Sequence, residues 1–136
     1  MLLLLTQMSC NGDKCAKGIQ EEVLYLMNLG PVIGVQNNTA AEVNLIQGSF
    51  YRSEMTGPRD LLEAMDLRVV GQVLTIGTAE CLNNEERVRI NLTLSSIHRV
   101  EANGSGNIRT EAPFTSRVTT LAMKPSGSAN MGVEHP

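Results

Sequence analysis

The segment "ERVRINLTLSSIHRV", residues 86–100, limits the possible fold more than any other part of the chain. Apolar side chains occupy alternate positions at Val88, Ile90, Leu92 and Leu94, and the positions between them are polar. A two-residue period is typical of a β-strand with one buried and one solvated face. The segment therefore predicts a strand that covers a hydrophobic core.

A second β-branched segment, "FTSRVTTLAM", spans residues 114–123, and the turn-forming pair Asn103-Gly104 lies between the two segments. Alternating segments joined by such a turn are typical of a β-hairpin. We therefore expect residues 86–100 and 114–123 to pair antiparallel as a long C-terminal hairpin, with Val88, Ile90 and Leu92 covering an N-terminal helix.

That helix is predicted to begin after Asp13, which can cap its first turn, and to end at Gly30-Pro31. Its apolar stripe consists of Cys15, Ile19, Val23, Leu26 and Met27. The sequence further predicts short strands or irregular connections at 32–36, 41–47 and 49–54. A short helix is expected from Pro58 to about Asp66, and one core strand over 67–77.

The fold class expected from these elements is α+β, with the N-terminal helix packed on an antiparallel sheet that ends in the long hairpin. A chain of 136 residues fits one globular domain, residues 1–136. Residues 1–12 form an apolar N-terminal segment, and residues 124–136, rich in Pro, Gly and Ser, are expected to be an irregular tail. No internal repeat is recognised.

The charge balance argues against nucleic acid as a partner. Eleven basic and fourteen acidic side chains give a net charge of -3, so no broad electropositive surface is expected. The glycines form no nucleotide-binding pattern, and no cluster of Cys and His has metal-ligand spacing. We expect neither a cofactor nor a metal.

Three cysteines cannot all pair within one chain. Cys10 and Cys15 are separated by four residues and can close a small disulfide loop in an oxidising compartment, which would leave Cys81 free. Three reduced thiols are the alternative.

The N-terminal segment "MLLLLTQMSC" has no basic start and is far shorter than the roughly 20 apolar residues that span a bilayer. It is either a buried first element or the end of a longer hydrophobic segment. The side chains that we expect to contact a partner at an interface are Leu2, Leu3, Leu4, Leu5 and Met8.

Catalytic residues are not predicted. His98 lies near the end of the alternating strand, and Cys81 could serve as a nucleophile beside it. An isolated histidine at a strand end is more often a surface or packing residue. A small enzyme or ligand-binding domain that uses Cys81 and His98 therefore remains an alternative.

The pair "RVRINLTL" and "FTSRVTTLAM", joined by a glycine-containing turn, resembles the closing strands of the globular portion of minor pilins and pseudopilins. The cleavage site and long apolar helix that define that group are absent, and residues 1–7 match at most a fragment of them. The resemblance implies assembly into a filament or secretion apparatus.

The sequence thus predicts a non-enzymatic structural or assembly subunit at the cell surface or outside the cell. Its expected partners are protein subunits in a homo- or hetero-oligomer, with membrane contact only through the N-terminus or a partner subunit. A cytoplasmic regulatory module is the remaining alternative.

Overall fold

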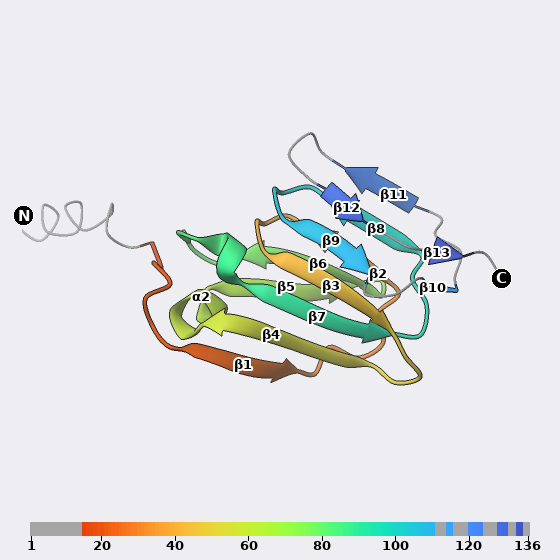
Figure 1. The fold of residues 1–136 in the computed structure, drawn as a ribbon, viewed down its shortest axis with the longest axis horizontal. Helices are drawn as coiled ribbons and strands as arrows, with labels where there is room; N and C mark the ends of the chain where they lie inside the picture. Colours follow the sequence, from red (N-terminus) through yellow and green to blue (C-terminus); the bar gives the residue numbers. More distant parts are fainter. Residues whose placement is uncertain (1–14, 111–113, 116–119, 124–127, 131–132, 135–136) are drawn as a thin grey trace, which may run out of the picture.

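The computed structural model of the protein describes residues 15–110, 114–115, 120–123, 128–130 and 133–134. Two β-sheets face each other, with the hydrophobic core between them (Figure 1). In spatial order, the six-stranded sheet contains β1 (Glu22–Met27), β4 (Arg52–Pro58), β7 (Arg89–Leu94), β3 (Glu42–Gln47), β9 (Asn107–Thr110) and β12 (Ser128–Asn130).

The five-stranded sheet contains β11 (Thr120–Met123), β8 (Arg99–Ala102), β2 (Gly34–Asn37), β6 (Val73–Thr78) and β5 (Met65–Val70). A separate two-stranded pair consists of β10 (Phe114–Thr115) and β13 (Val133–Glu134). Helical structure within the described residues is limited to α2 (Arg59–Glu63) and the 3-10 turn η2 (Glu85–Arg87).

Most of the molecule is a parallel β-coil, in which the chain passes between the two sheets and equivalent strands stack in parallel. The units β6–β7, β2–β3, β8–β9 and β11–β12 each place one strand in each sheet, and these units stack on one another. Residue 34 pairs with 99 and residue 43 with 108, so two units are related by the same offset of 65. The next unit follows at an offset of 21, because residue 99 pairs with 120 and residue 107 with 128. At the opposite end of the stack, β1, β4 and β5 run antiparallel to their neighbours.

The prediction from residues 86–100 is confirmed for the burial of its apolar face. Val88, Ile90, Leu92 and Leu94 are at most 1% exposed. They pack with aliphatic side chains from the facing sheet, namely Val35, Leu74, Ile76 and Val100. Each such side chain removed from water stabilises the fold by about 1.5–3 kcal/mol.

The predicted hairpin is wrong. β7 pairs in parallel with β3 and antiparallel with β4, and β8, from the same sequence segment, belongs to the other sheet. β11 pairs in parallel with β8. Asn103-Gly104 forms the corner between β8 and β9, which carries the chain from one sheet to the other. β12 and β13 lie within 124–136, where we expected an irregular tail.

The predicted N-terminal helix, and with it the α+β class, is also wrong. Residues 22–27 form the strand β1, in which Val23, Tyr25 and Met27 are partly buried against the core while Leu24 and Leu26 are exposed. Several apolar residues of the predicted helical stripe also fit a two-residue period, so the sequence alone did not separate the two structures. The hydrogen-bonded pairing with β4 stabilises residues 22–27 as a strand and not as a helix.

The short helix predicted from Pro58 is confirmed as α2, although it ends at Glu63, and its Leu61 and Leu62 are buried. The single strand predicted over 67–77 is two strands. Gly71 and Gln72, both with positive φ, form a two-residue turn that folds β5 against β6 as a hairpin.

A disulfide holds the segment before β1 against the β6–η2 loop. Cys15 is bonded to Cys81 across a sequence separation of 66 residues. Cys15 therefore does not pair with Cys10 and Cys81 is not free, which corrects the predicted small loop; Cys10 lies outside the described residues. Backbone bonds from Ala16 N–H to the Cys81 carbonyl (2.9 Å) and from Asn83 N–H to the Ala16 carbonyl (2.7 Å) continue the attachment.

Asp60 fastens the same segment from the other side. Its carboxylate accepts hydrogen bonds from the backbone N–H groups of Gly18 (2.9 Å) and Gln20 (3.5 Å). Burial by itself raises the pKa of the Asp60 carboxyl, but these donors outweigh it, and the pKa lies below its ordinary value. Nearby, a hydrogen bond from Arg59 lowers the pKa of Glu21.

Candidate functional site

The corners where β2 meets β3 and β8 meets β9 are held by a buried amide. Asn37 is fully buried; its Oδ1 accepts hydrogen bonds from Thr39 N–H (3.0 Å) and Thr39 Oγ1 (2.8 Å), and its Nδ2 donates to the Ala41 carbonyl (2.9 Å). The second corner stacks directly on the first, because Asn103 N–H donates to the Asn37 carbonyl (2.8 Å) and Gly106 N–H to the Thr39 carbonyl (3.0 Å).

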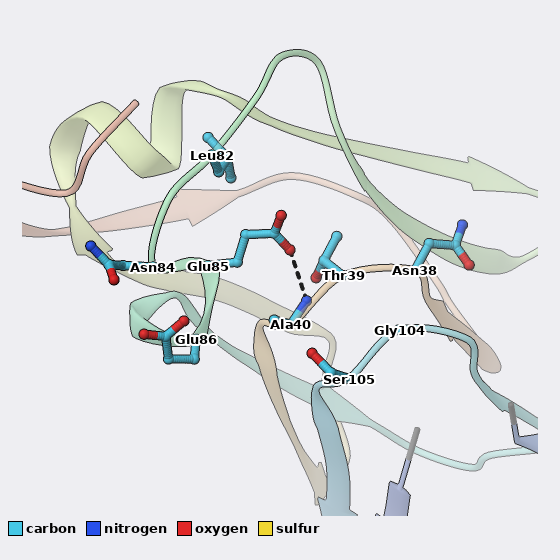
Figure 2. Close-up of a pocket in the computed structure, with 9 residues that line it drawn as sticks. All are labelled: Asn38, Thr39, Ala40, Leu82, Asn84, Glu85, Glu86, Gly104 and Ser105. Carbon is cyan, nitrogen blue, oxygen red and sulfur yellow. Dashed lines mark hydrogen bonds between the residues drawn. The ribbon is translucent and has the colours of Figure 1, made fainter. Parts of the chain in front are cut away.

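A pocket of about 390 Å³ opens beside these stacked corners, where the β6–β7 loop approaches them (Figure 2). It is lined by Asn38, Thr39, Ala40, Leu82, Asn84, Glu85, Glu86, Gly104 and Ser105. Several of its polar groups serve the fold: Glu85 accepts a hydrogen bond from Ala40 N–H (2.9 Å), Asn84 donates to the Lys17 carbonyl (3.1 Å), and Asn38 accepts from Asn103 (2.9 Å). The first bond fixes the loop against the β2–β3 corner, the second holds the loop to the segment before β1, and the third joins the two corners. We therefore assign this pocket mainly to structure.

A second cavity, of about 340 Å³, lies on the outward face of the six-stranded sheet and is lined by Glu42, Asn44, Arg89, Asn91 and Arg109. We call it the outer groove. Its residues come from the neighbouring strands β7, β3 and β9, and the register explains why they meet. Asn44 lies beside Asn91 on one side and Arg109 on the other, and Glu42 lies beside Arg89.

The charges of the outer groove are incompletely neutralised. Arg109 donates to the Glu42 carboxylate at 3.4 Å, so one carboxylate serves a groove that contains two guanidinium groups. Asn91 donates at 3.4 Å to Glu54, which also binds Arg52. A local excess of one positive charge thus occurs in a chain whose net charge is -3.

The structure separates the residues that the enzyme alternative requires. Cys81 is in a disulfide and has no free thiol. Cys81 follows the end of β6. His98 precedes Arg99, and Arg99 lies level with Val73 at the start of β6 because both residues pair with Gly34. Cys81 and His98 therefore lie near opposite ends of β6, and a six-residue strand is about 20 Å long. Leu2–Leu5 and Met8 lie outside the described residues, so their predicted role in an interface stays a prediction.

Two general features accompany this geometry. Over the part of the chain that the structure describes, no group of three or more His, Cys, Asp or Glu side chains is arranged to hold a metal ion. No helix among the same residues is long and apolar enough to cross a bilayer.

The fold and the outer groove define a class: β-coil domains built from stacked parallel strands, with polar side chains presented on one sheet. Residues 33–135 match the sequence profile of the family described as "Putative auto-transporter adhesin, head GIN domain". The match covers most of the chain, and the protein belongs to this family. No protein of curated function matches it.

Solved structures share the fold at low sequence identity. A "putative adhesin" from Parabacteroides distasonis has a TM-score of 0.69 at 18% identity, over 88% of this chain and 59% of that one. A "putative adhesin" from Bacteroides fragilis has 0.67 at 11%, over 78% and 53%. A "putative lipid binding protein" from Parabacteroides distasonis has 0.73 at 13%, over 88% and 53%. The chain spans about half the length of these proteins.

These comparisons overturn the resemblance to minor pilins and pseudopilins. The family and its structural neighbours are adhesin-like, and the two segments that suggested pilin strands pair with other parts of the sheets. The sequence-based expectation treated residue 89 only as one of the polar positions of the alternating segment, without a connection to Glu42, Asn44 or Arg109. A signal was present, since "EVNL" at 42–45 and "RINL" at 89–92 share a pattern and pair in register.

Proposed function

We propose that this chain is a non-enzymatic binding head presented at the cell surface, and that it recognises saccharides that carry carboxylate groups through the outer groove. Membership of an adhesin head family supports the general role. The Cys15–Cys81 disulfide fits an oxidising, extracellular setting. Because Cys81 is bonded to Cys15, it has no free thiol to act as the nucleophile that the enzyme alternative requires.

The observation that carries the proposal is the composition of the outer groove. Two asparagines and a glutamate offer the donors and acceptors that sugar hydroxyl groups require. Arg89 and Arg109 add planar guanidinium groups, which bind carboxylates through paired hydrogen bonds. The excess positive charge favours an acidic sugar over a neutral one, and a groove lined by these side chains suits a polar ligand better than a lipid chain.

Rigid presentation also supports this function. The groove residues stand on three adjacent strands whose alternate side chains, including Val43, Ile90 and Ile108, are fully buried. Because each strand is fixed by its core face, its outward side chains are held at the spacing of about 4.8 Å that separates neighbouring strands. Little ordering is therefore needed when a ligand binds, which favours affinity.

Calorimetric titration with oligogalacturonate, and with a neutral galactose oligomer of equal length, tests the proposal. We expect the acidic oligomer to bind more tightly, and we expect Arg89→Gln and Arg109→Gln each to weaken its binding about tenfold, the effect of losing one charge-assisted hydrogen bond of about 1.4 kcal/mol. Arg68→Gln is the matched control, because Arg68 is an exposed arginine on the other sheet, paired with Asp66.

Two results would count against the proposal. Equal affinity for the acidic and the neutral oligomer would remove the role of the arginines. An equal loss of binding in Arg68→Gln and Arg89→Gln would show that general charge, and not the outer groove, attracts the ligand.

A further inference from the structure

One edge of the six-stranded sheet is formed by β1. Its six residues pair antiparallel with β4, from Glu22 opposite Pro58 to Met27 opposite Ser53. Among the residues that the structure describes, no strand pairs with the other side of β1, and Figure 1 shows it as the outermost strand of its sheet. A strand in this position presents a row of backbone donors and acceptors that another strand can use.

The hydrogen-bond pattern shows which residues turn these groups outward. Arg59 N–H donates to the Glu21 carbonyl at 2.9 Å, so Glu21 and every second residue after it face β4. Glu22, Leu24 and Leu26 therefore direct their backbone N–H and C=O groups to the free edge. The position of Pro58 agrees with this pattern, because a residue without an N–H group lies opposite Glu22.

Two of these residues, Leu24 and Leu26, carry apolar side chains that are exposed. Leu24 is 51% exposed and Leu26 is 64% exposed on the outward face. The β5 edge of the five-stranded sheet is different, because β5 carries Asp66 and the exposed Arg68, and charged side chains on an edge strand oppose pairing. The segment from Val23 to Asn28, which contains the residue after β1 and all of β1 except Glu22, carries no charged side chain.

We propose that two copies of this chain associate through β1, side by side and antiparallel about a two-fold axis perpendicular to the sheet. This arrangement keeps outward side chains beside outward side chains, so paired residues must both be even-numbered or both odd-numbered. One such register places Leu24 of each copy opposite Leu26 of the other. It also places Glu22 opposite Asn28 and Tyr25 opposite its own counterpart on the inner face.

Apolar contact and charge select this register over its neighbours. A shift of two residues in one direction places Glu22 opposite Leu26, and a shift in the other places Leu24 opposite Asn28. Only the central register uses all four leucines of the pair, and it keeps the two Glu22 carboxylates at opposite ends of the contact. The free-edge groups of Leu24 and Leu26 then form hydrogen-bonded pairs with the other copy.

The association has a consequence for binding that goes beyond the single head. The two-fold axis leaves the outward faces of both copies on the same side, so both outer grooves face the same surface. A contact through one strand is at the low end of interface sizes, and we expect a reversible dimer that depends on concentration. Two grooves that engage one surface together gain avidity without any new contact.

Cysteine cross-linking tests the contact and its register. In a Cys10→Ser background, which retains the Cys15–Cys81 bond, Leu24→Cys and Leu26→Cys are prepared as separate proteins. The Cα atoms of a hydrogen-bonded pair are about 5.5 Å apart, within disulfide range, whereas two copies of the same variant hold their new cysteines more than about 7 Å apart. We therefore expect a cross-linked dimer from the mixture of the two proteins under mild oxidation and none from either protein alone.

Sedimentation velocity over a concentration series gives the second readout. Leu26→Lys is expected to weaken association at least about tenfold, because it brings a charge into the leucine contact. Val70→Lys is the matched control, since Val70 is 68% exposed on β5 and should change association less than about twofold. A wild-type chain that stays monomeric up to about 1 mM, a failure of the mixture to cross-link, or cross-linking of Leu24→Cys alone would each overturn the proposal. None of these results bears on saccharide binding by a single head.

Discussion

Replacement of Gly106 by alanine is expected to separate the two stacked corners and to destabilise the protein by about 3 kcal/mol. A Cβ atom at residue 106 would overlap the Ala41 carbonyl oxygen and lie 2.8 Å from the carbonyl carbon of Ala40. Both neighbours are backbone atoms, so no side-chain rotation relieves the overlap, and the ordinary contact distance of about 3.4 Å requires the corners to move apart.

The size of the effect follows from the bonds that such a movement breaks. Three backbone hydrogen bonds join the corners: Asn103 N–H and Gly104 N–H donate to the Asn37 carbonyl at 2.8 and 3.1 Å, and Gly106 N–H donates to the Thr39 carbonyl at 3.0 Å. At about 1 kcal/mol each they contribute about 3 kcal/mol, a large part of the 5–15 kcal/mol typical of a domain.

Urea denaturation followed by circular dichroism measures the free energy of unfolding. Gly77→Ala is the control, because Gly77 lies in β6 and an added Cβ there would approach no closer than 3.7 Å to the Asp66 carbonyl oxygen. We expect this variant to change stability by less than about 0.5 kcal/mol. If Gly106→Ala cost no more than Gly77→Ala, the close stacking of the corners would be refuted.

Three further predictions concern the attachment of the first segment and the corner. Cys15→Ser with Cys81→Ser should lower the free energy of unfolding by up to about 4 kcal/mol, because the bond closes a long loop; urea denaturation of oxidised and reduced protein checks this. Asp60 has a lower pKa in the folded than in the unfolded chain, so its contribution to stability is complete above about pH 4 and is lost as the pH falls through the folded pKa. Asp60→Asn should therefore flatten the acid loss of stability in thermal melts between pH 5 and 2.5. An unchanged acid loss would show that the bond from Gly18 to Asp60 is unimportant. Asn37→Asp should cost about 2 kcal/mol in thermal or urea unfolding, since it sets a carboxylate oxygen against a backbone carbonyl in a buried site, and an unchanged stability would contradict the corner geometry.

Sequence periodicity predicted which side of residues 88–94 is buried, because burial depends on the alternation of side chains within one strand. It did not predict the partners of that strand. The neighbours of β7 are β3 and β4, which precede it by more than thirty residues, and not the β-branched segment that follows. Local turn signals favoured a hairpin, but Asn103-Gly104 serves a corner whose chain passes to the opposite sheet.

The repeat of the coil escaped detection because its spacing is irregular. "VQNNTAAEV" at 35–43 and "VEANGSGNI" at 100–108 occupy equivalent positions at an offset of 65, whereas the following unit lies at an offset of 21. Only the strand registers relate them, and the shared residues are few: a valine, an asparagine and small residues at the corner. A search for one fixed period has nothing to find in such a chain.

Coil architecture also explains why the outer groove could not be assembled from sequence spacing. The core occupies the inward positions and hydrogen bonds occupy the corners, so a ligand can contact the strands mainly on the outward face and at the sheet edge. Parallel stacking places equivalent outward positions in rows across the strands, and Asn44, Asn91 and Arg109 form one such row although 65 residues separate the first from the last. An outward side chain in such a row can change without disturbing the buried residue next to it on the strand. Sequence variation at these positions would therefore alter ligand choice while the fold is retained, which is what a binding head requires.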